Sequence, residues 1–226
     1  MTQRIHCAIL LLATLATLGA APAVQAQAKG DWLAKLGANK ITPHVNSGEM
    51  SAPAKPGIKG DVGPDTKPIL TIGYMLNDNL SAEVLLGVPY EHKFYGAGSV
   101  EGIGQIGTSE VLPPTAFLHY RLFGPAAAVR PYLGLGYSYL YFQKETGSAQ
   151  MTSMMNPGGP PSTYTLDSKH TICLALGVSA RLSERIFADL MLVKSKLKTT
   201  AHFNSGQQLP IKIDPTAISL SLGYRF

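Results

Sequence analysis

The sequence has few charged residues and no long hydrophobic run beyond its N-terminus. Only 15% of its 226 residues are charged, and the mean hydropathy lies just above zero. Disordered chains combine low hydrophobicity with high net charge, and coiled coils are dominated by Ala, Glu, Lys, Leu and Arg, so both classes are excluded. A multi-span helical membrane protein is excluded because no later window approaches the roughly 18 uncharged apolar residues of a spanning helix. Among the classes considered, the composition leaves a Gly-rich, all-β protein.

The N-terminal 26 residues are expected to be a cleaved secretory signal peptide. Arg4 supplies a basic start, residues 7–21 are apolar, and small residues stand at the cleavage position. Cleavage is predicted after Ala26 or Ala28, leaving residues 27–226 as one domain. The alternative, an uncleaved membrane anchor, is disfavoured because no stop-transfer pattern follows. Loss of Arg4 lowers the formal net charge from +5 to +4.

Patterns typical of disulfides, nucleic-acid binding and catalysis are missing as well. One of the two cysteines lies in the signal peptide, so Cys173 has no intramolecular partner and is expected to be a small core residue. No Lys/Arg run is present, so nucleic acid is not expected as a partner. The histidines lack metal-ligand spacing, and no nucleophile elbow occurs. We therefore predict no enzyme activity, no metal site and no cofactor.

Apolar residues recur with a period of two, which is typical of strands, and no segment keeps a helical period. Gly, Pro, Asn or Asp clusters separate the segments. Eight strands are predicted: Asp31 to His44, Lys67 to Leu76, Leu80 to Phe94, Ser109 to Phe123, Arg130 to Lys144, Leu166 to Leu182, Arg185 to Thr199 and Ile211 to Phe226.

The connections between these strands alternate in length. The short ones are Asn77 to Asn79, Gly124 to Val129, and Ser183 with Glu184. The long ones are Val45 to Thr66, Tyr95 to Thr108, Glu145 to Thr165 and Thr200 to Pro210. Short periplasmic turns and long extracellular loops are typical of outer-membrane barrels. The sequence thus predicts an eight-stranded antiparallel transmembrane β-barrel in the outer membrane of a Gram-negative bacterium, with both termini periplasmic.

One face of each strand is almost free of charge, as in Leu70, Ile72, Tyr74 and Leu76. A soluble eight-stranded barrel would carry charge outside, so we expect the apolar face to contact outer-membrane lipid. Arg130 is predicted to anchor the membrane interface together with Tyr132. The candidates for interfacial aromatic girdles are Tyr74, Tyr90, Tyr137, Tyr139, Tyr141 and Tyr224.

The opposite face is predicted to line a narrow apolar interior. Eight strands leave too little space for a water-filled pore, and apolar side chains beside glycines suit a slender hydrophobic ligand. A closed core with the same packing is the alternative. The predicted lining residues are Ile69, Met75, Leu85, Phe117, Leu140, Met191, Val193 and Leu197.

Charged residues at inward positions gather toward the periplasmic mouth, where we predict a carboxylate and guanidinium network that closes the lumen. Its predicted members are Glu83, Asp189, Arg121, Arg181 and Arg225. A closed floor would make an apolar molecule leave sideways through the wall. Pro89, Pro113 and Pro114 cannot donate ladder hydrogen bonds, so they indicate where the wall is weakest.

The last strand alternates small and apolar residues and ends on an aromatic one. Tyr224 and Phe226 close a Ser-Leu-Gly-Tyr-Arg-Phe sequence that is similar to the signal read by the outer-membrane assembly machinery. We therefore expect that machinery to be a partner during biogenesis.

Several motifs, in order, resemble the OmpW family of small outer-membrane barrels, which includes AlkL. They are residues 73–93, Leu112 to Thr115, Arg130 to Gly136 and Leu222 to Phe226. The resemblance implies a narrow hydrophobic channel for small hydrophobic molecules. It also implies a constriction at Leu85, although Val193 stands where the family's Trp is expected. A non-transporting receptor barrel and a lipid-modifying barrel enzyme are the alternatives, and no polar triad supports the latter.

Overall fold

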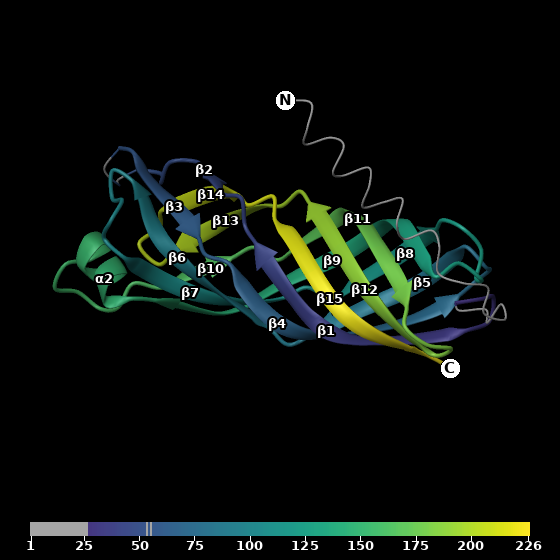
Figure 1. The fold of residues 1–226 in the computed structure, drawn as a ribbon. Coiled ribbons are helices and arrows are strands. Elements are labelled where there is room, and N and C mark those ends of the chain that lie inside the picture. The colour runs from purple at the N-terminus through teal and green to yellow at the C-terminus, as the bar shows by residue number, and fades with distance from the viewer. Residues whose placement is uncertain (1–26, 53, 55) are drawn as a thin grey trace, which may run out of the picture.

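The computed structural model describes residues 27–226 except 53 and 55, so the predicted signal peptide lies outside the described residues. Eight antiparallel strands form a closed barrel, which confirms the predicted fold (Figure 1). These strands are β1 (Trp32–Thr42), β4 (Asp65–Met75), β5 (Leu80–Gly87), β8 (Thr115–Arg121), β9 (Val129–Gly147), β11 (Lys169–Arg181), β12 (Ile186–Ser195) and β15 (Thr216–Arg225). Closure comes from the pairing of β1 with β15, in register from Leu33 opposite Arg225 to Thr42 opposite Thr216.

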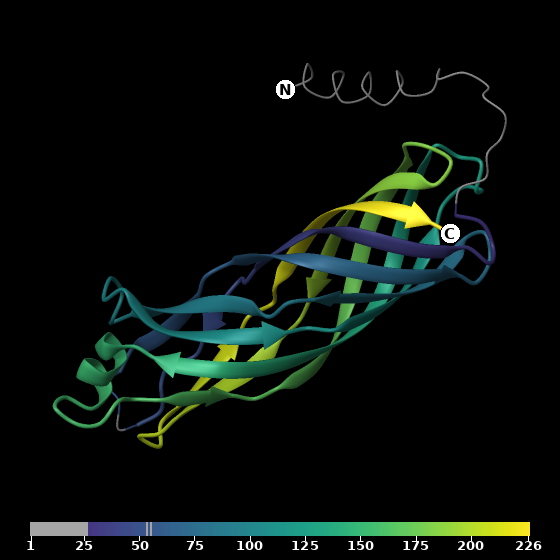
Figure 2. The same cartoon turned by 90° about the horizontal axis from the view of Figure 1, so that it is seen from below.

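Each of the predicted long loops contains strand segments, which is a correction to the sequence prediction. They continue the barrel beyond the membrane on the extracellular side, while the short turns and Phe226 lie at the other end (Figure 2). The additional strands are β2 (Asn46–Ser47), β3 (Ile58–Val62), β6 (Tyr90–Gly98), β7 (Gln105–Leu112), β10 (Tyr164–Leu166), β13 (Lys198–Phe203) and β14 (Gln208–Lys212). Their inner faces pack around Phe94, Tyr164 and Phe203, so this part has its own apolar core.

One helix, α2 (Ala149–Met155), occurs where the sequence predicted only a loop. The Ser148 side chain accepts a hydrogen bond from the Met151 amide at 3.2 Å and so caps the helix. Met151 is its buried residue. Two turns are too short for a helical period to emerge from the pattern, which explains the missed helix. Among the described residues, no helix has the length and hydropathy needed to cross a membrane.

Five of the eight predicted strands are each broken in two, and three of these breaks contain proline: Pro89, Pro113 with Pro114, and Pro215. The other two breaks divide the predicted strands Leu166 to Leu182 and Arg185 to Thr199. The pairing of β5 with β8 ends at Leu85 opposite Thr115, and that of β6 with β7 begins only at Tyr90 opposite Val111. The interruption shifts the alternation, so Tyr90 points inward and is 1% exposed. The prediction that Tyr90 belongs to an aromatic girdle is therefore wrong. Its hydroxyl accepts a hydrogen bond from the Asn39 amide at 2.7 Å.

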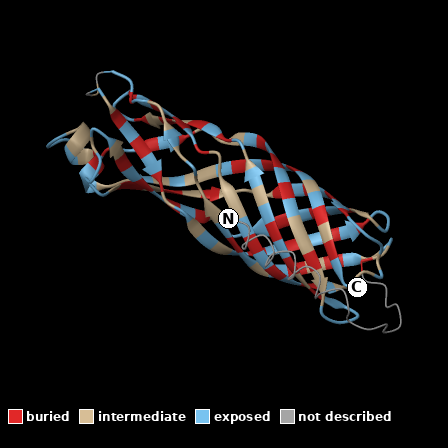
Figure 3. Ribbon diagram, turned by 45° about the horizontal axis from the view of Figure 1, so that its top comes forward, coloured by how far each residue is buried: buried red, intermediate tan, exposed pale blue. Residues whose placement is uncertain are grey.

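Buried and exposed residues alternate along the barrel strands, as Figure 3 shows. On β11 the outward residues Ile172 and Leu174 are 64% and 65% exposed. From Ile172 to Leu182 a strand tilted by about 40° rises about 25 Å, the height of a lipid-facing band. Exposed aromatic residues border this band at both ends: Tyr137, Tyr139 and Tyr141 on the extracellular side, and Trp32, Tyr74, Tyr120 and Tyr224 on the periplasmic side.

Candidate functional site in the barrel interior

A buried ammonium group joins two carboxylates in the periplasmic half of the barrel. Lys35 on β1 places its Nζ 2.8 Å from Glu83 Oε2 and 3.1 Å from Asp189 Oδ1. All three side chains are at most 3% exposed. Because an isolated buried charge is strongly destabilising, each of these groups depends on its partners for a stable place in the barrel.

Glu83 also binds a guanidinium group from β8. Arg121 Nη2 donates to Glu83 Oε1 at 2.7 Å, and its Nη1 donates to Ser81 Oγ at 2.6 Å. Ser81 in turn donates to the same Glu83 oxygen at 2.9 Å, and His119 Nδ1 lies 3.2 Å from it. Two cations thus face two carboxylates, which balances the formal charge of this cluster.

Asp189 is oriented by two hydroxyl groups. Tyr132 donates to its Oδ1 at 3.0 Å, and Ser179 donates to its Oδ2 at 2.7 Å. The Tyr132 ring centroid also lies 5.1 Å from the Arg121 guanidinium carbon. A Cβ atom at Gly177 would lie 2.2 Å from the Tyr132 ring, so only glycine leaves room for the ring against the wall. We call Lys35, Ser81, Glu83, His119, Arg121, Tyr132, Ser179 and Asp189 the floor cluster.

The first described residue covers the floor cluster from the periplasmic side. Gln27 accepts a hydrogen bond from Arg121 Nε through its side-chain oxygen at 3.0 Å, and its carbonyl oxygen accepts from Arg130 Nη1 at 2.8 Å. Arg130 also donates to the carbonyl oxygens of Asp78 and, at 3.0 Å, Phe123 in the periplasmic turns. Gln27 and Arg130 are each 2% exposed, so the barrel is closed here.

The structure brings together three of the five residues predicted for this network, namely Glu83, Asp189 and Arg121. Arg225 lies at the rim instead, where it donates to Asp31 Oδ2 at 3.2 Å. Arg181 is the last residue of β11 and is half-buried.

Several members of the site were missed in the sequence, and two were misplaced. Tyr132 and Arg130 are buried inside the barrel, so the prediction that they anchor the membrane interface is wrong. Leu133 and Leu135 on β9 face outward, so the period of two predicts that Tyr132 faces inward. Lys35 stands two positions from the inward Leu33 and was detectable in the same way.

A mostly apolar cavity of about 70 Å³ lies directly above the floor cluster. Leu85 and Met191, which line it, stand two residues above Glu83 and Asp189 on the same strands. Five predicted lining residues surround it: Leu85, Phe117, Leu140, Met191 and Val193. Leu85 and Val193 therefore line the same cavity, and the implied constriction there stays a prediction. Cys173 also lines this cavity and is 3% exposed.

A second apolar cavity of about 40 Å³ lies on the extracellular side of the first. The predicted lining residues Leu140 and Leu197 border it, and Ile41, Pro113 and Leu140 border both cavities. Ile69 is buried in the cluster around the lower cavity. Met75 instead packs with Leu33 and Phe187 at the periplasmic end, away from both cavities.

Almost all of the described chain matches one protein family. The model of the OmpW family matches residues 28–226. The chain belongs to the OmpW family. It is 31% identical to Outer membrane protein W of Vibrio cholerae serotype O1 over 220 residues, which cover 95% of this chain and 97% of that protein. This OmpW-family chain is therefore an outer-membrane barrel of a Gram-negative bacterium, as predicted.

Two further similarities are informative. The chain is 27% identical over 176 residues to the dibenzothiophene metabolism operon protein PahQ of Pseudomonas aeruginosa, covering 76% of each chain. The crystal structure of the outer membrane protein OprG from Pseudomonas aeruginosa superposes with a TM-score of 0.80 at 24% identity, covering 89% of this chain and 99% of that one. The family and its solved neighbours are outer-membrane barrel proteins.

Among the described residues, no group of three or more His, Cys, Asp or Glu side chains is placed to hold a metal ion. Tyr224 and Phe226 lie with their ring centroids 5.0 Å apart at the outer periplasmic edge, where both are exposed. Their role in assembly remains a prediction.

Proposed function

We propose that this barrel lets small hydrophobic molecules pass from the extracellular side into the outer membrane. The molecule enters the apolar interior, stops above the floor cluster and leaves sideways through the wall between β5 and β8. The observation that carries this proposal is the position of Pro113, which borders both apolar cavities and lies where strand pairing is interrupted.

The interruption in the wall spans residues 86–89 on one strand and 112–114 on the other. Pro89, Pro113 and Pro114 have no amide hydrogen to donate, so the ladder cannot continue through them. Leaving by this path requires fewer broken backbone hydrogen bonds than at any continuous part of the ladder. The outlet opens into lipid, because Leu86 and Val88 in the interruption are exposed on the outer face.

The floor cluster directs the molecule to this outlet. Passing straight through would bring an apolar solute among the charges of Lys35, Glu83 and Asp189 and would break their contacts, at a cost of several kcal/mol. The extracellular path has no such barrier, because the linings of the two cavities contain no Lys, Arg, Asp or Glu. The two cavities are small, so passage needs side chains to move, and Met50 and Met151 in the extracellular core are flexible enough to do so.

The similarity to PahQ supports the proposal, since that protein's name ties it to the metabolism of an apolar aromatic compound. A barrel that acts only through its extracellular part would have the same fold. The two possibilities predict different results for a substitution inside the lumen, which should reduce uptake only if molecules pass through the barrel.

Uptake of a series of hydrophobic solutes by whole cells tests the proposal. Leu85 lines the lower cavity, so Leu85→Arg should reduce uptake to the level of a deletion strain, whereas Leu85→Met should retain it. Both variants must reach the outer membrane as folded barrels in equal amounts. Equal uptake by the deletion strain and its parent would refute the proposal.

A further inference from the structure

Three exposed lysines form a stripe on the outer face of the barrel. Lys194, Lys196 and Lys198 are exposed, whereas Ser195 and Leu197 between them are half-buried and buried, so the three lysines share the outer face although they are not contiguous in sequence. Within the described part of the chain, the Lys194 ammonium group makes no ion pair or hydrogen bond, and the Lys196 ammonium group has only an electrostatic attraction to Asp214, while the Lys196 carbonyl accepts a hydrogen bond from Thr171 Oγ1 at 2.7 Å. Neither of these two cations at the top of the lipid-facing band is therefore held in an ion pair.

The same two lysines line an open groove of about 690 Å³. Lys194 lies opposite Leu174 in the β11 and β12 register, and Ile172 lies opposite Tyr137 on β9. The groove also contains the Asp214 carboxylate, which lies 3.1 Å from Lys212 Nζ. The groove thus keeps a positive charge, and its lower wall is apolar.

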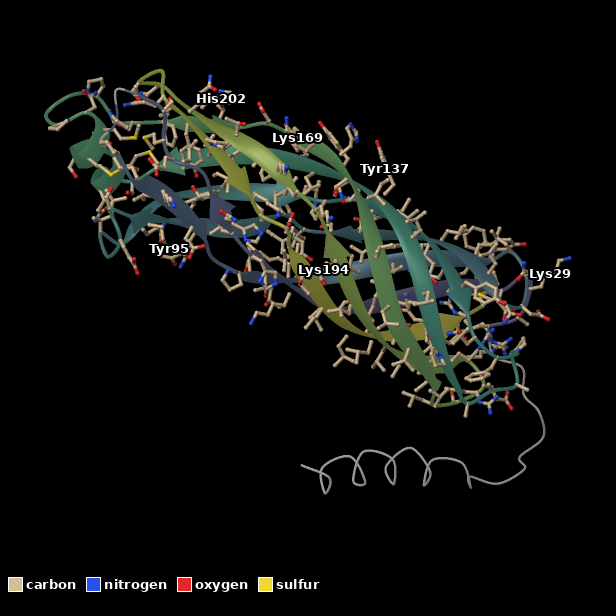
Figure 4. The ribbon with its side chains drawn as sticks, turned by 90° about the horizontal axis from the view of Figure 1, so that it is seen from above. Lys29, Tyr95, Tyr137, Lys169, Lys194 and His202 are labelled. Atoms are coloured by element: carbon tan, nitrogen blue, oxygen red, sulfur yellow. The ribbon has the colours of Figure 1, made fainter. Side chains whose placement is uncertain are left out.

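The level of the groove in the membrane is marked by its aromatic neighbours. The hydroxyl of Tyr137 and Nδ1 of His170 are 2.8 Å apart, and the His170 ring lies 4.6 Å from that of Tyr139. Tyrosines of this kind mark the interface between headgroups and acyl chains. In Figure 4, Tyr137, Lys169 and Lys194 lie near the middle of the long axis, between Lys29 at the periplasmic end and His202 in the extracellular part.

We propose that this groove binds a phosphorylated lipid of the outer leaflet. The lipid phosphate lies between Lys194 and Lys196, and an acyl chain covers Ile172 and Leu174. A zwitterionic lipid would bring as much positive as negative charge to the lysines and so complement them less well. A protein partner could not reach Ile172 and Leu174, which lie within the lipid-facing band. Charge and depth together therefore favour an anionic lipid, because basic residues at the surface of a membrane attract anionic headgroups.

Titration of the full chain in zwitterionic detergent with bisphosphorylated lipid A, followed by native mass spectrometry, tests this site. The variant K194Q/K196Q should bind about tenfold more weakly, since each lysine near a membrane surface contributes to anion attraction. The matched control is K59Q/K93Q, which removes two exposed lysines from β3 and β6, on the side of the extracellular part where Figure 4 labels Tyr95. The control should bind as the unchanged protein does.

Three outcomes would overturn the proposal. Equal weakening in both double variants would indicate general charge attraction, and equal binding of fully dephosphorylated lipid would indicate apolar contact alone. The charge-preserving variant K194R/K196R should keep its affinity, and its loss would also contradict the assignment. If K194Q/K196Q does not fold, salt titration of the unchanged protein decides instead, because added salt must release phosphorylated lipid and spare the dephosphorylated form.

Discussion

Lys35 on β1 and Glu83 on β5 form a 2.8 Å ion pair although β4 separates their strands. The strand between them, β4, carries Gly73 at the level of the pair. A Cβ atom at Gly73 would lie 2.7 Å from Glu83 Cγ, so the absence of a side chain leaves space for the Glu83 stem. The ion pair thus depends on one glycine as well as on its two charges.

Loss of the Lys35 charge should destabilise the barrel strongly. Lys35→Met leaves Glu83 and Asp189 with Arg121 as their only cation in the floor cluster, and breaking a buried pair in this way costs about 3 to 5 kcal/mol. Urea unfolding in lipid vesicles measures the change. The double variant K35M/D189N, which restores the charge balance, should recover much of the loss. The exposed Lys40 offers the control Lys40→Met, and an equal effect there would contradict the argument.

A single added methyl group should displace Tyr132. Gly177→Ala places a Cβ atom within 2.2 Å of the ring, which must move away from Asp189. We expect a loss of about 1 to 3 kcal/mol, the usual cost of an overpacked core. Gly124→Ala is the matched control, since a Cβ atom there meets nothing within 4 Å. An unchanged unfolding midpoint for Gly177→Ala would show that the ring has room to move.

The alternating pattern was enough to predict the eight membrane strands, because lipid selects for apolar side chains at every second residue. The inward carboxylates Glu83 and Asp189 could be placed in the same way. Tyr132 follows a short turn, which favours a position at the membrane interface, but its alternation with the exposed Leu133 on β9 places it inside the barrel. Tyr90 is a different case. The change of phase after Pro89 depends on which backbone groups find partners in three dimensions, and no local pattern contains that information.

The extracellular part was the least predictable region. Strands such as β13 and β14 pair only with each other and with short neighbours, and their burial comes from an apolar core assembled from four separate loops. In the sequence these segments contain Pro, Gly and Ser, which favour a loop assignment. Contacts between distant segments decide their structure.

Acid should destabilise the folded barrel through His92, which lines the second cavity. Burial lowers the pKa of His92, and the nearby Lys67 lowers it further. The hydrogen bond with the Gly63 carbonyl and the charge of Asp65 act in the opposite direction but are outweighed. Below the usual pKa, near 6.5, the unfolded chain binds a proton that the folded chain resists, so stability falls as the pH drops from 6.5 toward the lowered value. Unfolding measured between neutral and mildly acidic pH checks this. His92→Gln should flatten the profile, and an unchanged profile would contradict it.

The C-terminal aromatic residue should be needed for assembly more than for stability. Phe226 is 71% exposed, and its amide donates to the Trp32 carbonyl at 3.0 Å, a contact that any residue could make. Phe226→Ala is therefore expected to reduce the amount of folded barrel in the outer membrane severalfold. Barrel refolded in detergent should unfold within about 0.5 kcal/mol of the unchanged protein, as is usual for a surface substitution. Equal amounts in the membrane would argue against a role in assembly.

Closing the interruption in the wall should slow uptake and leave the floor cluster intact. The variant P113V/P114V restores two amide donors and introduces residues with high β-propensity, so the ladder can extend toward residues 86–89. We expect slower hydrogen exchange in residues 86–89 together with severalfold lower uptake of hydrophobic solutes. The exposed Pro210 on β14 provides the matched control Pro210→Val, which changes a strand proline away from the interruption. If exchange slows and uptake stays unchanged, molecules do not leave between β5 and β8, whereas unchanged exchange would show that the prolines are not what interrupts the ladder.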